Sequence, residues 1–356
     1  MSTALRGACV AFAAFAFVYI FGFSDLGRSE YNAFASTTPQ VLKSEPPQLD
    51  KADYDARMLA LAHVKIATST LASSTPRVAS TTVRRWPVKS VYPNAGAILP
   101  FKRVVAYYGN FYSKGMGVLG QYPTDQMLKM LKDASAAWAA ADPATPVVPA
   151  IQYIAVVAQG SAGKEGKYIL RMPDDQIDHA LDLAKQVNGI VILDVQVGQS
   201  TLEHELPMLD AYLKLPQVHL AIDPEFSMKY GNPPGRVIGT FDAADINFAA
   251  EHLAALVRAN NLPPKILVVH RFTQAMVTNY KKIEPLPEVQ IVMDQDGWGT
   301  QAKKIGTYTN VIASEPVQFT GMKLFYKNDI KPPSTGMLSL KQVLNLTPAP
   351  IYIQYQ

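Results

Sequence analysis

The chain has very little cysteine: Cys9 is the only one among its 356 residues. Because Cys9 lies within the apolar N-terminal segment, the rest of the chain offers no thiol for catalysis, for a disulfide or for a structural zinc site. Runs of basic residues are also missing, and the formal net charge is only +4. A nucleic-acid partner is therefore not expected, since it would require a concentrated cationic surface. Hydrophobic residues make up 48% of the sequence, which is enough to bury a full core.

Residues 1–23 predict a signal or anchor segment. Arg6 precedes an apolar stretch from Ala8 to Phe23, whose length suits the core of a signal peptide and is short for a membrane span. A cleavage-like tripeptide at 33–35 lies well beyond that stretch, so an uncleaved membrane anchor is favoured over a cleaved signal, and a buried core helix is the remaining alternative. The expected location is extracytoplasmic, either membrane-anchored or secreted.

Residues 24–100 predict a stalk, because serine, threonine, proline and alanine dominate and cannot assemble a core. One fragment, Tyr54 to Ala67, has amphipathic spacing and predicts a short helix that docks on the domain. The folded domain is expected over residues 101–356.

From residue 101 onward, short apolar runs alternate with segments of helical period, which is typical of repeated βα units. The runs are continuous rather than alternating, as expected for parallel strands that are covered on both faces. About eight units of this size predict a single closed (β/α)8 TIM-type barrel, and an open doubly wound α/β sheet is the alternative. The expected strands are Val104–Tyr108, Val148–Val157, Ile190–Leu193, Val218–Ile222, Val237–Gly239, Ile266–Val269, Val289–Met293 and Phe319–Phe325.

Three of the intervening helices can be placed from their end signals. The first is expected to be capped by Thr124, the second to lie between Pro173 and Gly189, and the third to span about 243–259.

Ionisable residues follow several of the expected strands. The carboxyl ends of barrel strands converge on one face, which holds the active site in this fold. Residues two apart on an extended segment point to the same side, and carboxylates that close cannot all ionise freely. One of them should have a raised pKa, as a general acid beside a base or nucleophile requires. The candidate catalytic residues are Glu225, Asp223, Asp194, Asp294 and Asp296.

Aromatic and polar residues at the same strand ends predict contacts to sugar rings. Some have a structural explanation as well: an aspartate after a strand often caps the next helix, and a histidine can be a satisfied core residue. Arg271, next to His270, should point to the opposite side of its strand. The candidate substrate-binding residues are Tyr107, Tyr108, Gln196, His270, Trp298 and Lys323.

The segment Gly115–Gly120 fits the G-x-G-x-x-G pattern of dinucleotide-binding proteins, but its context is wrong. It is separated from the first strand, Pro123 stands before the helix, and no ribose-binding acid ends the second strand. A glycine loop over the barrel mouth is expected instead. No cofactor is expected, although the carboxylates and one histidine leave a divalent cation as an open alternative.

A set of short motifs runs in order along the domain: Tyr107-Tyr108-Gly109, Met116–Gly120, Leu193–Gly198, Ala221–Glu225, Val268–His270, Asp296-Gly297, Lys323–Tyr326 and Tyr352–Gln356. This set resembles an uncharacterised family of exported, lipoprotein-like bacterial proteins with a glycosidase-like TIM barrel. The resemblance implies a barrel and export, and it brings no established activity. Arg271 stands where glutamine is usual, Phe226 where tryptophan is usual, and no good lipobox precedes the stalk.

The leading expectation is a cell-surface glycoside hydrolase-like protein that acts on envelope or extracellular polysaccharide. The expected partners are a polysaccharide or cell-wall glycan and, through the N-terminal segment, the membrane. A non-catalytic glycan-binding or scaffolding barrel and a metal-dependent hydrolase are the alternatives.

Overall fold

The computed structural model describes residues 48–64 and 85–356. The expected signal or anchor segment, and residues 24–47 and 65–84 of the expected stalk, lie outside these ranges. Within them, no helix is both long enough and apolar enough to cross a bilayer.

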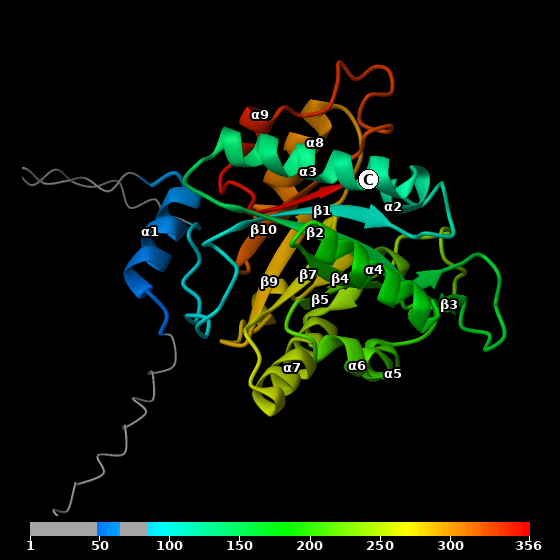
Figure 1. The fold of residues 1–356 in the computed structure, drawn as a ribbon. Coiled ribbons are helices and arrows are strands. Elements are labelled where there is room, and N and C mark those ends of the chain that lie inside the picture. Colours follow the sequence, from blue (N-terminus) through cyan, green and yellow to red (C-terminus); the bar gives the residue numbers. More distant parts are fainter. Residues whose placement is uncertain (1–47, 65–84) are drawn as a thin grey trace, which may run out of the picture. The chain divides into compact units, whose positions relative to one another are not determined.

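Eight parallel strands close into a barrel (Figure 1). The strands, in their order around the barrel, are β1 (Arg103–Gly109), β2 (Val147–Ala158), β4 (Ile190–Val195), β5 (Val218–Ile222), β7 (Lys265–Arg271), β9 (Val289–Gln295), β10 (Phe319–Leu324) and β11 (Tyr352–Tyr355). Strand β1 pairs with both β2 and β11, so the sheet has no free edge within the barrel. The expected (β/α)8 barrel is confirmed, and the open-sheet alternative is wrong.

The expected strand at Val237–Gly239 is wrong. Val237 and Ile238 are 46% and 50% exposed in the loop that follows β5, so they contribute to no core. The eighth barrel strand is β11 at the end of the chain, which joins β10 to β1. A run of three apolar residues is too short to distinguish a strand from a loop, and the four residues of β11, all of them buried, are nearly as short.

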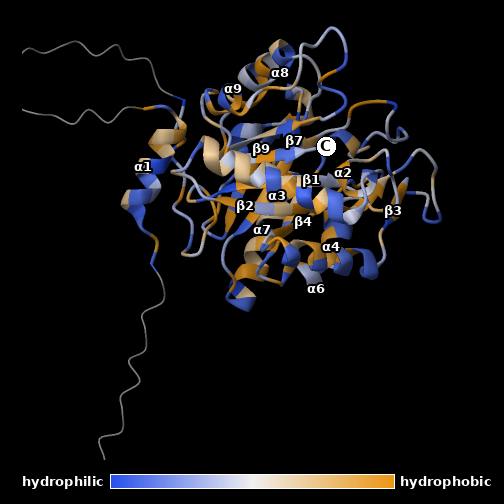
Figure 2. Ribbon diagram, turned by 45° about the horizontal axis from the view of Figure 1, so that its top comes forward, coloured by the Kyte–Doolittle hydropathy of each residue, from blue (hydrophilic) through white to orange (hydrophobic). Residues whose placement is uncertain are grey.

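Helices cover the outside of the barrel. They are α2 (Val118–Gln121), α3 (Thr124–Ala141), α4 (Asp174–Gln186), α5 (Leu202–Glu205), α6 (Asp210–Leu213), α7 (Ala243–Asn260), α8 (Gln301–Thr307) and α9 (Leu340–Leu344). Figure 2 shows that α3 and α4 mix hydrophilic and hydrophobic residues along their length, whereas β2 and β4 are mainly hydrophobic. Helix α7 begins with a capping box between Asp242 and Asp245 and ends at Asn261 in the left-handed conformation.

The three expected helices are confirmed as α3, α4 and α7. The expected cap at Thr124 is wrong, because Thr124 is the first residue of α3 and the N-cap position is Pro123, without a side-chain cap. Shorter elements complete the fold: β3 (Ile169–Arg171), antiparallel to β2; β6 (Phe241–Asp242), paired with β8 (Val277–Thr278); 3-10 turns at Leu206–Leu209, Pro224–Phe226, Gln274–Met276 and Tyr280–Lys282; and a π-helical turn at Tyr308–Ile312.

Two separate hydrophobic clusters reveal which side of each strand faces the barrel axis. The larger cluster joins strands to the covering helices, for example Leu193 of β4 with Ala180 of α4. The smaller cluster fills the barrel interior and contains Ile190 and Ile192 of β4. Because side chains alternate along a strand, Asp194, two residues beyond Ile192, also faces the axis. The same alternation applies at the ends of the other strands: a polar residue two positions beyond an inward-facing residue also faces the axis.

Part of the segment expected to be a stalk packs against the amino-terminal end of the barrel. Tyr54 and Met58 of α1 (Lys51–Leu61) belong to the interior cluster together with Leu99. The Gln290 side chain, at the start of β9, binds the backbone of Ile98 and Leu99. The described residues 48–64 and 85–100 are therefore part of the packed domain, and the expected domain boundary at residue 101 lies too late.

Candidate active site

A cavity of about 590 Å³ opens at the carboxyl ends of the barrel strands. Its wall combines carboxylates, a buried lysine and aromatic rings, so it can surround a polar ligand that also has flat apolar faces. Among the residues that line it are Tyr108, Met116, Gln196, Asp223, Glu225, Phe226, Phe272, Asp296, Trp298, Lys303, Lys323, Phe325 and Asn328.

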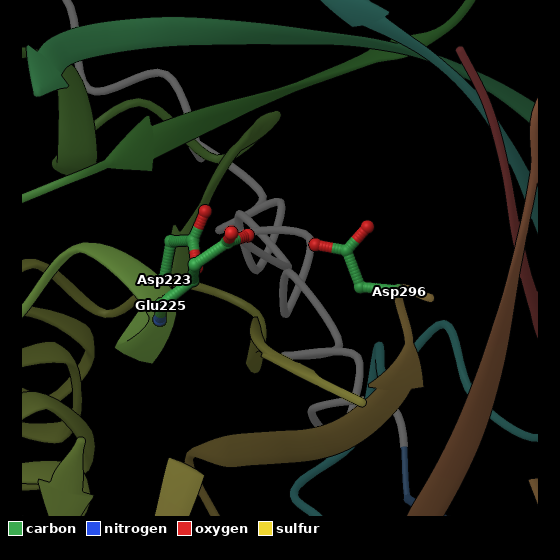
Figure 3. Close-up of side chains that lie close together, drawn as sticks. All are labelled: Asp223, Glu225 and Asp296. Carbon is green, nitrogen blue, oxygen red and sulfur yellow. Dashed lines mark hydrogen bonds between the residues drawn. The ribbon is translucent and has the colours of Figure 1, made fainter. Parts of the chain in front are cut away.

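Three carboxylates meet in this cavity (Figure 3). Asp223 and Glu225 come from the turn after β5, and Asp296 comes from the end of β9 on the other side of the group. One oxygen atom from each lies within 4.8 Å of the other two. The Asp223 carboxylate accepts a hydrogen bond from the backbone N–H of Glu225 at 3.0 Å. This contact, with Pro224 between the two residues, fixes the turn that presents Glu225.

Asp296 is held between two positive groups. The Lys323 Nζ atom is 2.9 Å from one carboxylate oxygen, and the His270 Nδ1 atom is 3.2 Å from the other. Burial by itself raises the pKa of Asp296, but the charges of Lys323 and His270 outweigh burial and leave this pKa below its ordinary value. Asp296 is therefore ionised throughout the neutral range.

Glu225 lies in the opposite electrostatic situation. Burial, and then the negative charge of Asp296, raise its pKa to about 7, while the more distant Lys323 and His270 offset only part of this rise. The pKa of Asp223 is also raised, mainly by burial and further by the neighbouring carboxylates. The site thus combines a carboxyl group that holds its proton near neutral pH with a carboxylate that has lost it. The first can act as a general acid, and the second as a base or nucleophile.

A fully buried polar layer lies below the cavity and supports Asp296. His270 Nε2 is 2.8 Å from the Asp194 carboxylate, and Gln152 donates to the same Asp194 oxygen at 2.6 Å. Tyr352 donates to the Gln152 side chain in turn. Burial lowers the pKa of His270, but the surrounding aspartates more than compensate, so its pKa lies well above the ordinary value and the ring is a cation.

Asp294 belongs to this same layer. Its nearest positive group is His270, with Nδ1 at 3.5 Å, and neither of its carboxylate oxygens has a hydrogen-bond partner among the described residues. Burial raises its pKa. Gly321 of β10 is required beside it, because a Cβ atom there would lie 2.5 Å from the Asp294 carboxylate and 2.8 Å from the Tyr352 ring.

The expected site residues therefore divide into groups. Glu225, Asp223, Asp296, Tyr108, Gln196, Trp298 and Lys323 line the cavity. Asp194, Asp294 and His270 have no exposed surface and are not among the residues that line it. The expected catalytic role of Asp194 and Asp294 and the expected substrate-binding role of His270 are therefore corrected: these side chains support the cavity from below. Tyr107 does not approach the cavity at all. It faces the helices and donates to, or accepts from, the Tyr326 hydroxyl at 2.7 Å.

The mouth of the cavity is shaped by loops. Gly115 and Met116 line it, which agrees with the expected glycine loop. Gly117 has φ of 127°, and a Cβ atom there would lie 2.3 Å from the Tyr108 carbonyl oxygen, so the close approach of this loop to β1 requires glycine. Gln196 donates to the Tyr108 hydroxyl at 3.2 Å, and Lys323 lies 3.8 Å from the centre of the Tyr108 ring.

Several residues of the site were not expected from the sequence. Gln152 and Tyr352 of the buried layer lie inside strands, and Lys303, Phe325 and Asn328 line the cavity. Gln152 has a signal in its own strand, because its amide both donates and accepts hydrogen bonds within a stretch of β2 that is otherwise apolar except for the Tyr153 hydroxyl.

The three clustered carboxylates have the donor type that hard divalent cations prefer. The Lys323 ammonium group, however, already lies 2.9 Å from Asp296, and the His270 cation lies 3.2 Å from it. A divalent ion would have to enter beside both positive charges. Lys323 and His270 thus already supply the positive charge that Asp296 requires, and the residues present do not fit a metal ion.

No protein-family model matches the chain, and no curated protein matches it. Among solved structures, it is similar to a GH5 xyloglucan-specific endo-β-1,4-glucanase from a metagenomic library in complex with cellotriose, with 13% identity, 58% of this chain and 74% of that chain covered, and a TM-score of 0.32. A GH5-4 broad-specificity endoglucanase from an uncultured bovine rumen ciliate gives 12% identity, coverage of 66% and 77%, and a TM-score of 0.35. GH26C from Muricauda sp. is 10% identical, with 75% of this chain and 75% of that chain covered and a TM-score of 0.29. Scores at this level add nothing to the topology seen in the strand pairing.

Proposed function

We propose that this protein hydrolyses glycosidic bonds in a polysaccharide, with Glu225 as the general acid and Asp296 as the ionised partner. The observation that carries the proposal is the opposite shift of the two pKa values within one open cavity, to about 7 for Glu225 and downward for Asp296. To protonate the leaving sugar oxygen, a site needs one carboxyl group that keeps its proton near neutral pH beside a second one that has lost it.

The separation of the carboxylates favours retention of configuration. The nearest oxygen atoms of Glu225 and Asp296 lie within 4.8 Å, close to the roughly 5 Å of a retaining pair and below the roughly 6.5 Å at which an inverting pair begins. In the first step, Asp296 forms a bond to the anomeric carbon as the glycosidic bond breaks and Glu225 protonates the leaving oxygen. In the second step, Glu225, now a carboxylate, takes a proton from water, and that water displaces Asp296 from the sugar.

The other residues of the cavity have supporting roles in this proposal. Asp223 holds the backbone of Glu225, and Lys323 and His270 keep Asp296 ionised. The rings of Phe226, Phe272 and Trp298 supply faces on which sugar rings can stack.

The proposal is tested with Glu225→Gln, which keeps the size of the side chain but cannot transfer the proton. We expect the variant to lose hydrolysis of a bacterial or plant glycan by at least roughly 100-fold, the usual scale of general acid catalysis. Its stability at pH 5 should not fall. Glu284→Gln, an exposed glutamate outside the cavity, is the matched control and should keep full activity. An active Glu225→Gln protein, or glycan binding by the wild type without product release, would contradict the assignment.

We also propose that the protein acts outside the cytoplasm, on envelope or extracellular polysaccharide. This proposal rests on the apolar segment Ala8–Phe23 behind Arg6 and on a domain without cysteine. Fractionation of cells that express the full chain tests it, and recovery in the cytosolic fraction would contradict it.

A further inference from the structure

The loops around the cavity mouth carry an unusual balance of charge. In the loops that follow β1, β2, β5 and β10, every exposed charged side chain is basic except Glu165, which is paired with Arg171. The exposed basic residues are Lys114, Lys164, Lys167, Lys229, Arg236, Lys327 and Lys331. Exposed acidic residues also occur at the starts of α3 and α4, where the helix dipole favours them, whereas Glu165 is the only exposed acidic residue in these four loops. These four loops therefore form a positive part of the rim above an acidic floor.

Most of these cations have no counter-charge within the described part of the chain. Lys229 is paired with Asp245, whereas no ion pair involves the other six side chains there. A one-sign rim of this kind raises the local concentration of ligands with the opposite charge. Because the net charge of the whole chain is only +4, the concentration of positive charge at the mouth is not a consequence of a generally basic composition.

Trp298 lines the cavity and lies close to two basic residues. Its side chain follows Asp296 by two residues, lines the cavity and is 51% exposed. The Nζ atoms of Lys303 and Lys331 lie 5.3 and 5.8 Å from the centre of its ring. Lys303 lines the cavity as well. An exposed aromatic face with two ammonium groups beside it can stack on a sugar ring and bind an acidic substituent of that ring at the same time.

We propose that the substrate is an anionic polysaccharide, with a carboxylate, sulfate or phosphate on the sugar unit that stacks on Trp298. This inference rests on the proposed hydrolytic function for the reaction, although the charge preference concerns binding. The charged unit lies at the rim beside Lys303 and Lys331. The bond to be broken lies over Glu225 and Asp296, where a negative substituent would be repelled by the carboxylates.

An anionic membrane surface could also attract a basic rim. The glycan is favoured because Trp298 and Lys303 line the same cavity as the carboxylates, which a sugar chain can enter and a flat bilayer surface cannot.

Binding is measured with the Glu225→Gln protein, so that hydrolysis does not interfere. The probes are pairs of polymers that share a backbone and differ in charge: polygalacturonate against its methyl ester, and carboxymethyl cellulose against hydroxyethyl cellulose. We expect at least one acidic polymer to bind more tightly than its neutral partner, with an affinity that falls as salt is raised. Combining Lys303→Met with Lys331→Met should weaken that binding roughly four- to 25-fold, since each exposed ion pair contributes a factor of about two to five and the two factors multiply. Neutral polymers should be unaffected.

Lys185→Met is the matched control, because Lys185 is an exposed lysine at the far end of α4 and should leave binding unchanged. Equal binding of acidic and neutral polymers, or equal losses for both in the double variant, would overturn the inference. So would a double variant that loses only binding to phosphatidylglycerol vesicles. Hydrolysis of neutral glycans without charge preference would leave the proposed function standing and remove this inference. Preferential binding of acidic polymers by a wild-type protein that hydrolyses none of them would support this inference and remove the proposed function.

Discussion

Replacing Glu225 by glutamine should change how the stability of the protein depends on pH, and this effect can be calculated before any substrate is known. The pKa of Glu225 is about 7 in the folded protein, against 4.5 for a free side chain. The folded state therefore binds the proton more tightly than the unfolded state. Glu225 contributes its full stabilisation below pH 4.5, and this contribution is lost as the pH rises through 7. Glutamine does not titrate, so the variant avoids the loss.

The magnitude follows from the difference between the two pKa values. One pKa unit corresponds to 1.36 kcal/mol, so a rise from 4.5 to about 7 corresponds to about 3 kcal/mol. This is an upper bound, because Asp223 shares the burial and its own pKa is raised too. The difference in free energy of unfolding between Glu225→Gln and wild type should therefore be near its lowest value at pH 4.5. It should grow by up to about 3 kcal/mol by pH 8 and then remain level.

The assay is urea unfolding followed by tryptophan fluorescence at pH 4.5, 5.5, 6.5, 7.5 and 8.5. Asp223 and His270 also titrate in the wild type, but they remain in the variant, so subtraction of the two curves largely isolates Glu225. Glu284→Gln serves as the control and should run parallel to wild type. A Glu225→Gln curve that is also parallel to wild type over this range would refute the raised pKa and, with it, the assignment of the general acid.

Other predictions concern activity, metals and the fold. Catalytic activity should decline as the pH rises through about 7, because Glu225 then loses its proton. Lys323→Met should move the acid limb of the pH–rate profile upward by about 1 to 3 pH units, because Asp296 loses the positive charge that pairs with it. A chelator should leave activity unchanged, and magnesium, calcium or manganese should alter the free energy of unfolding by less than about 0.5 kcal/mol in a titration. Tyr107→Phe should cost about 1 kcal/mol of stability and leave kcat/KM unchanged, whereas Tyr108→Phe should lower kcat/KM several-fold. Ile238→Ser should change stability by less than about 0.5 kcal/mol, and Ile353→Ser should cost about 2 to 5 kcal/mol.

The sequence was sufficient to predict the barrel and the face that holds the carboxylates. Seven of the eight barrel strands are apolar runs long enough to recognise, and a polar residue at the end of such a run lies at one mouth whatever the details of packing. The spacing of Asp294 and Asp296 correctly placed both on the inner side of β9. It did not separate them by depth. Two residues along a strand correspond to roughly 6.6 Å, which is the difference between lining the cavity and lying beneath it.

Tyr107 shows a second limit of sequence reasoning. All residues of β1 are buried, because one face meets the barrel interior and the other meets the helices. With no exposed face there is no hydrophobic alternation, so the sequence of β1 alone does not tell which tyrosine points inward. The pairing of β1 with its neighbours decides it: Tyr107 is opposite Tyr355, whose side chain belongs to the outer cluster. The short strand β11 escaped recognition for a related reason, since its four residues offer too little pattern.

The assignment of roles to the two catalytic carboxylates depends on where the positive charges lie. Glu225 and Asp296 share one cavity, and both are desolvated, so burial alone would raise both pKa values and would not divide the two groups into an acid and a carboxylate. The two cations of the site, Lys323 and His270, both contact Asp296, and no ion pair joins either of them to Glu225 among the described residues. They therefore stabilise the negative charge on Asp296, and that charge in turn favours the protonated form of Glu225. His270 can remain a cation in a fully buried position because aspartates surround it: Asp194 lies 2.8 Å away on one side, and Asp296 and Asp294 lie at 3.2 and 3.5 Å from its other ring nitrogen. Asp194 does not reach the cavity, but by stabilising the His270 cation it helps Glu225 and Asp296 to hold one proton between them.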